Sequence, residues 1–116
     1  MAITLTSGSA SISTAEYSLP GNTTSGVPLS SASTGVFQFL IDFRNMVSGD
    51  QYRVKLYERV YAAASQSGIE EWYLSGPQSQ PLFVTPSFIL GEGWDITAIR
   101  TAGTDRTVFW SLRKVA

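Results

Sequence analysis

Apolar side chains that alternate with a period of two residues are the feature that most constrains how this chain can fold. From position 36 the sequence reads VFQFLIDF, in which every second residue is aromatic or aliphatic. Successive side chains of a β-strand point to opposite faces, so one face of this segment carries Phe37, Phe39, Ile41 and Phe43. The alternation predicts a strand over residues 36–43 with that face in the core.

The same period continues over residues 51–61 and separates two kinds of side chain. Tyr52, Val54, Leu56 and Val60 fall on one side. The other side carries cationic and aromatic residues, which are Arg53, Lys55, Tyr57, Arg59 and Tyr61. The pattern predicts a strand whose first side is buried and whose second side faces water or a partner.

Further strand signals lie toward the C-terminus. Residues 69–74 place Trp72 and Leu74 on one face, and core packing is the expected role of the tryptophans. Residues 81–90 are apolar but contain two prolines, which favours an edge strand or one that bends and crosses between sheets. Residues 94–100 and 106–113 flank a turn-forming segment at 102–105, which predicts a hairpin.

These segments together indicate the fold class. About seven or eight short strands, with turn-forming residues between them and no amphipathic helix, predict an all-β fold. An antiparallel β-sandwich, with a jelly roll as one of its forms, is favoured over a barrel. The length of 116 residues and the hydrophobic share of 43% suit a single β domain over residues 1–116.

Residues 1–34 differ in composition from residues 35–116, which are expected to form the main sheet region. Glu16 is the only charged residue of this N-terminal segment, where Ser, Thr and Gly dominate, and every Lys and Arg lies at position 44 or later. We expect one or two short strands here and a long, partly mobile loop over residues 20–34. The segment serves either as a polar loop or as an arm that orders on a partner.

The residue types that most often carry catalysis or bind metals are missing from the sequence. The chain contains no cysteine and no histidine. The carboxylate pairs that remain, Glu70 with Glu71 and Glu92 with Asp95, are poorly placed, because neighbours on a strand point to opposite faces and Glu92 lies between two glycines. We therefore expect no catalytic residue, no cofactor and no metal, and a function in binding or assembly.

Charge and hydropathy narrow the choice of partner. The formal net charge of −1 argues against nucleic-acid binding over the whole domain, because such binding requires many phosphates to be neutralised. No stretch approaches the roughly 18 apolar residues of a membrane span. The absence of cysteine suits a reducing cytoplasm or a particle assembled there. We expect neither nucleic acid nor a membrane as the partner.

The polar side of residues 51–61 is the candidate interface. Tyr57 and Tyr61 lie beside Arg53, Lys55 and Arg59, and Tyr with Arg is a combination enriched in protein interfaces. The alternative is a solvated face with ion pairs across the sheet to Glu70 or Glu71.

Several short strings resemble small virion proteins of tailed bacteriophages that decorate or cement the capsid. They are residues 4–10 (TLTSGSA), 15–19 (AEYSL), 49–52 (GDQY), 56–58 (LYE), 93–97 (GWDIT), 103–106 (GTDR) and 110–114 (WSLRK). The resemblance implies a β-rich accessory subunit without catalytic residues, assembled in the bacterial cytoplasm and bound to the outer surface of the virion. Its partners would be the major capsid protein, other copies of itself, or both.

A second function remains open from the sequence. A carbohydrate-binding or receptor-binding β-sandwich of a phage tail or fibre would use exposed tryptophan or tyrosine side chains to stack on sugar rings.

Overall fold

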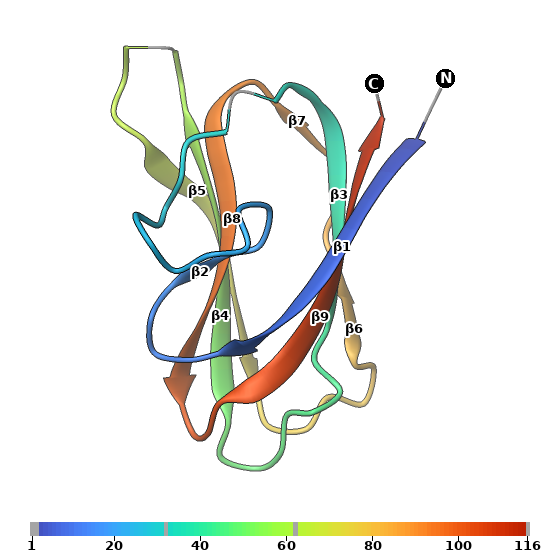
Figure 1. The fold of residues 1–116 in the computed structure, drawn as a ribbon. Coiled ribbons are helices and arrows are strands. Elements are labelled where there is room, and N and C mark those ends of the chain that lie inside the picture. Colours follow the sequence, from blue (N-terminus) through green and yellow to red (C-terminus); the bar gives the residue numbers. More distant parts are fainter. Residues whose placement is uncertain (1–2, 32, 62, 116) are drawn as a thin grey trace.

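The chain folds into two antiparallel sheets that pack face to face, as Figure 1 shows. A computed structural model describes residues 3–31, 33–61 and 63–115, and this part of the chain contains strands but no helix. The described residues form nine strands, which are β1 (Ile3–Ile12), β2 (Tyr17–Ser18), β3 (Gly35–Asp42), β4 (Gln51–Arg59), β5 (Ser67–Ser75), β6 (Leu82–Val84), β7 (Phe88–Leu90), β8 (Glu92–Ala102) and β9 (Arg106–Val115). The predicted all-β sandwich is confirmed.

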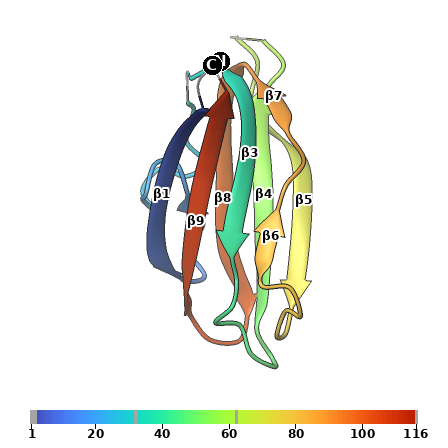
Figure 2. The same cartoon turned by 90° about the vertical axis from the view of Figure 1, so that its right-hand side faces the viewer.

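The strand order is that of a jelly roll. The first sheet has the order β1-β9-β3-β6, with β7 also paired to β3, and the second has the order β2-β8-β4-β5. Figure 2 shows the first sheet in front of the second. If β6 and β7 are taken as one interrupted strand, the pairs are nested: β1 with β9, β2 with β8, β3 with β6 and β7, and β4 with β5. The eight resulting strands form the two four-stranded layers of a jelly roll.

The inner faces of the two sheets form the core, as the alternation predicts. Phe37, Phe39, Ile41 and Phe43 are at most 5% exposed, and Tyr52, Val54 and Leu56 are fully buried opposite them. The rings of Phe37 and Trp94 meet with centroids 4.6 Å apart. Trp94 and Trp110 are buried, and Trp72 packs against the core from β5, so the predicted core role of the tryptophans is confirmed.

The prediction was wrong at the end of β4, where the alternation breaks. The pairing register shifts between Leu56 and Tyr57 on the β5 side, and between Tyr57 and Arg59 on the β8 side. Such irregularities interrupt the regular alternation of side chains between the two faces of a strand. Val60, expected in the core, is 87% exposed and follows the last residue of the strand. Tyr57 stays on the outer side as predicted, although only 9% of it is exposed.

The predicted hairpin between residues 94–100 and 106–113 is also wrong, because β8 and β9 belong to different sheets. The connection between β8 and β9 crosses from the second sheet to the first. Asp50, in the turn before β4, and Tyr52, in β4, form hydrogen bonds with it. The Thr104 N–H donates to Asp50 Oδ1 at 3.0 Å. The Arg106 N–H donates to the Tyr52 hydroxyl at 2.7 Å, and that hydroxyl lies 3.0 Å from the Thr104 carbonyl. These bonds satisfy backbone groups that a hairpin ladder would otherwise have paired.

The N-terminal segment contributes more structure than predicted, because β1 pairs with β9 over ten register positions. Apart from the buried Ile12 at its end, the core-facing residues of β1 are small, and Gly8 lies under the ring of Trp110. A Cβ at this position would lie 2.7 Å from Trp110 Cζ2, so the ring and a larger side chain could not both keep their places. The segment therefore has few large apolar residues because the ring of Trp110 fills the space above the middle of the strand.

Residues 81–90 form an edge, as the prolines predict, but do not cross between sheets. Both β6 and β7 pair with β3, and Thr85 between them exchanges hydrogen bonds with Phe39. The chain passes to the second sheet only after Leu90.

Candidate interaction surfaces

Three of the five predicted interface residues, Arg53, Lys55 and Tyr57, lie on the outer side of β4, and Glu16 lies over this part of the second sheet. Glu16 Oε2 accepts hydrogen bonds from the Tyr57 hydroxyl at 2.6 Å and from Arg53 Nη2 at 3.3 Å. It also accepts one from the hydroxyl of Thr97, a fully buried residue of β8. Burial, and next the neighbouring Glu16, raise the pKa of Tyr57.

One contact of this face is of the kind that the alternative reading predicted. Arg53 Nε lies 3.6 Å from Glu71 Oε1 on β5, which is a cross-strand ion pair of the expected kind. Lys55 Nζ lies 5.1 Å from the centre of the Tyr57 ring. Tyr61 is 62% exposed and lies beyond the end of β4, whereas Tyr57 lies within the strand. Arg53 and Tyr57 thus already form hydrogen bonds and an ion pair within the chain. A role in partner binding stays a prediction.

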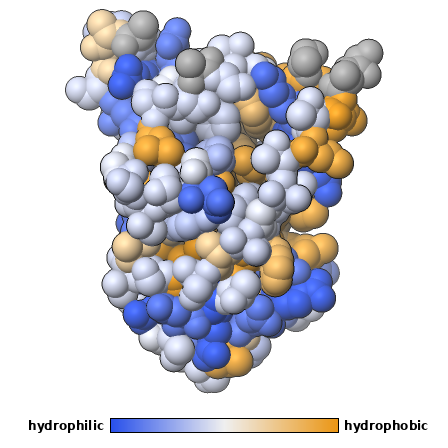
Figure 3. Space-filling view, viewed as in Figure 1, coloured by the Kyte–Doolittle hydropathy of each residue, from blue (hydrophilic) through white to orange (hydrophobic). Residues whose placement is uncertain are grey.

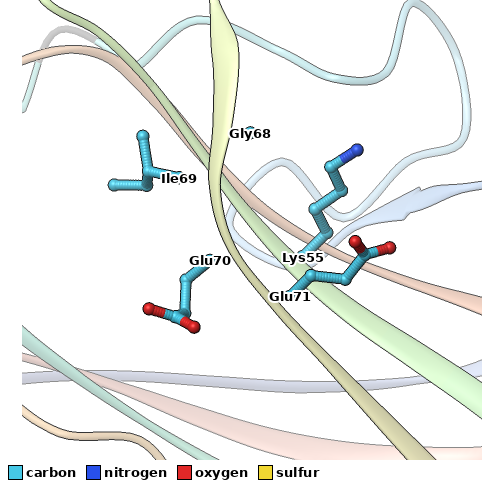
Figure 4. Close-up of a pocket in the computed structure, with 5 residues that line it drawn as sticks. All are labelled: Lys55, Gly68, Ile69, Glu70 and Glu71. Atoms are coloured by element: carbon cyan, nitrogen blue, oxygen red, sulfur yellow. The ribbon is translucent and has the colours of Figure 1, made fainter.

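A shallow depression of about 450 Å³ lies beside Lys55, at the junction of β4 and β5. Figure 4 shows Glu70 and Glu71 projecting from opposite sides of β5, which confirms that these two carboxylates cannot act on one substrate bond. Lys55 lies on the side of Glu71. Within the described residues no group of three potential metal ligands comes together.

The outer face of the first sheet is a surface that the sequence reasoning missed, and we call it the apolar sheet face. Ile89 is 84% exposed, and Ile3 and Leu5 are each 65% exposed. Apolar atoms are visible along the right-hand margin of Figure 3, on the side of this sheet. The partly or fully exposed apolar residues of this face are Ile3, Leu5, Val36, Leu40, Leu82, Val84, Ile89, Phe109 and Val115.

The pairing registers arrange these side chains in rows across the strands. Ile3, Val115, Val36 and Ile89 are consecutive partners across β1, β9, β3 and β7. Toward the other end of the sheet, a hollow of about 200 Å³ is lined partly by Leu40, Leu82 and Phe109. The whole face, polar side chains included, spans roughly 600 Å², because it consists of four strands about 4.8 Å apart and about eight to ten residues long. Exposed apolar patches larger than a few hundred Å² mark interaction sites.

Few charges interrupt the apolar sheet face. Asp42 forms an ion pair with Arg44 at 2.7 Å, and Arg113 lies between Leu5 and Gln38 in the register. The sequence signal that could have revealed this face is the run at 36–41, in which Val36 and Leu40 occupy positions where an exposed sheet face normally carries polar residues.

None of the protein-family models, curated proteins or solved structures compared with this chain matches it. In the part of the chain that the structure describes, no helix has the length and apolar character needed to cross a membrane.

Proposed function

We propose that this protein is a non-enzymatic virion structural protein that binds the outside of a bacteriophage capsid and stabilises it, and that it docks through the apolar sheet face. The observation that carries the proposal is the group of nine outward apolar side chains on one sheet, with few charges among them. A sheet face left in water normally alternates with polar residues, so this one suits a protein surface as its cover.

The fold and the sequence resemblance support the choice of a capsid as the partner. Jelly rolls are common in viral capsid proteins and in lectins, although a fold alone does not define a function. The strings that resemble decoration proteins fall partly in β1 and β9, two strands of the sheet that carries the apolar face. The major capsid protein is the proposed partner, and the outer surface of the virion is the proposed location.

The alternative, a carbohydrate-binding or receptor-binding module of a tail or fibre, is supported by fewer exposed aromatic side chains. The tryptophans pack in or against the core, and Trp94 Nε1 donates to the Ser33 carbonyl at 2.6 Å, so these rings are not free to stack on a sugar. Tyr61 and Tyr73 are 62% and 59% exposed and remain the aromatic candidates for this role.

Two matched double variants separate the two functions. Val84→Lys with Ile89→Lys places charges on the apolar sheet face, whereas Tyr61→Lys with Tyr73→Lys changes exposed residues elsewhere. Co-sedimentation with capsids assembled without this protein measures binding, and urea unfolding verifies that both variants fold. We expect the first variant to bind at least about tenfold more weakly, because a charge replaces each of two apolar contacts. The tyrosine variant should bind like the wild type.

Other outcomes contradict the proposal. If the double variant at Val84 and Ile89 binds capsids as well as the wild type does, the apolar sheet face is not the docking surface. If only the tyrosine variant loses binding to glycans or cells, the alternative function is favoured. Mass spectrometry of purified virions adds a copy number. Hundreds of copies per particle indicate a shell component, and a few indicate a tail component.

A further inference from the structure

We propose that the free edge of β1 pairs antiparallel with β1 of a second copy, so that the first sheets of two chains form one continuous sheet. The strand has the sequence ITLTSGSASI, which contains no charged residue and no proline. Its pairing with β9 runs through all ten positions without a bulge. An edge strand that is long, regular and uncharged is a template for another strand, because its outward N–H and C=O groups have no partner in the sheet.

The other sheet edges in the described parts of the chain carry features that discourage such pairing. The edge at β5 has two adjacent carboxylates, Glu70 and Glu71, and a register shift. The edge formed by β6 and β7 is interrupted at residues 85–87, where Pro86 cannot donate a backbone hydrogen bond. β2 has only two residues. Short strands, charges, bulges and prolines are the means by which proteins protect sheet edges, and β1 uses none of them.

A second copy fits this edge better than an unrelated strand. Without charged side chains, two copies of β1 meet without like-charge repulsion. In an antiparallel pair centred near Ser7, Ile3 and Leu5 of one chain lie beside the small side chains of Ser11 and Ser9 of the other. An unrelated strand is selected through pockets for alternate side chains. The outward positions Ser7, Ser9 and Ser11 of β1 are small residues that offer no deep pocket.

The flank at β1 is close in area to one side of a standard protein interface. A strand of ten residues is about 34 Å long, and two stacked sheets with their side chains are about 20 Å thick, so the flank at β1 presents roughly 700 Å². Each partner in a standard protein interface buries about 800 Å². Antiparallel pairing about a two-fold axis is closed, because each chain uses its β1 edge once. Association therefore stops at two chains.

The dimer has a consequence for docking, and this part of the inference rests on the proposed function. β1 belongs to the sheet that carries the apolar sheet face, so pairing at β1 makes the two faces contiguous. One chain presents roughly 600 Å², which is less than the share of one partner in a standard interface, whereas two chains present roughly 1,200 Å². The dimer would thus bind a capsid through a surface that a single chain lacks.

Charge substitutions at the centre of β1 test the pairing. In Ser7→Lys with Ser9→Lys, like charges face each other across the proposed two-fold axis, and in Ser7→Glu with Ser9→Glu the same repulsion arises with the opposite sign. Ser67→Lys with Ser75→Lys places the same charges on the β5 edge and is the matched control. Sedimentation equilibrium gives the molar mass, and thermal unfolding verifies that each variant is folded.

We expect the wild type and the β5-edge control to sediment at about twice the 12.6 kDa of one chain. Each β1 variant alone should dimerise at least about tenfold more weakly, and an equimolar mixture of the Lys and Glu variants should regain the dimer, because opposite charges then face each other. A wild type that stays monomeric at about 100 µM, about one hundred times a dissociation constant of 1 µM, would overturn the inference. So would undiminished dimerisation of both β1 variants.

The two proposals can fail separately. A dimer that does not bind capsids refutes the proposed function and leaves the pairing of β1 intact. Conversely, capsid binding by the monomeric β1 variants with unchanged affinity refutes the role of the dimer in docking and leaves the proposed function intact.

Discussion

Glu16→Ala tests how the N-terminal segment is held on the second sheet. The Glu16 side chain is 17% exposed, and its Oε2 atom accepts hydrogen bonds from Tyr57, Arg53 and Thr97. The alanine variant leaves two hydroxyls in buried surroundings and one guanidinium without this acceptor. An unsatisfied buried donor costs about 1–3 kcal/mol, and the three effects are not additive because they share one oxygen atom. We expect a loss of about 2–4 kcal/mol in the free energy of unfolding.

Urea titration of Glu16→Ala beside Glu70→Ala provides the measurement. Glu70 is an exposed glutamate of β5, so its removal should change the free energy of unfolding by no more than about 0.5 kcal/mol. Glu16→Gln keeps an acceptor oxygen, so its loss in the free energy of unfolding should lie between those of Glu16→Ala and Glu70→Ala. In Glu16→Ala the pKa of Tyr57 should fall, because one cause of its elevation is removed while burial remains. Equal stability losses in Glu16→Ala and Glu70→Ala would show that these hydrogen bonds do not stabilise the fold.

Two further predictions concern the core and the arch between the sheets. Phe39→Ala, which empties a fully buried aromatic site, should cost about 3–5 kcal/mol in urea unfolding, and a loss below about 1 kcal/mol would contradict the assigned inner face. The Arg106 guanidinium and the N–H groups of Val47 and Thr104 lower the pKa of Asp50 to about 2. A lowered carboxyl pKa stabilises the folded state above the unfolded value of 3.8, and this contribution is lost as the pH falls toward 2. Thermal melts should therefore show the stability advantage of the wild type over Asp50→Asn shrinking from pH 4 to pH 2, and a constant difference would contradict this role of Asp50.

The alternation along residues 36–43 was enough to predict a strand and its inner face. Phe37, Phe39, Ile41 and Phe43 are buried as expected, because the direction of a side chain on a strand depends only on its position in the local pleat. The pattern of short strand segments predicted the fold class for a similar reason. Many short apolar segments without helical periodicity can bury their apolar faces only by stacking sheets.

The candidate surfaces could be predicted only in part. Arg53, Lys55 and Tyr57 lie on the outer side of β4, but the hydrogen bonds of Arg53 and Tyr57 with Glu16 join residues 37 and 41 positions apart. No local pattern marks such a pair. The apolar sheet face was missed because the run at 36–41 has apolar residues on both faces of the strand. Only the packing of the whole chain shows that one of these faces stays uncovered.

Strand pairing was decided by the tertiary structure. Residues 102–105 suit either a hairpin or an arch, and the choice depends on Asp50 and Tyr52, which hold Thr104 and Arg106 from about 50 positions away in the sequence. The exposure of Val60 likewise depends on register shifts against strands on both sides of β4. A strand's own residues determine which side chains share a face. Its neighbours, its register and the cover on each face depend on contacts between distant segments, which exist only once the whole sandwich has formed.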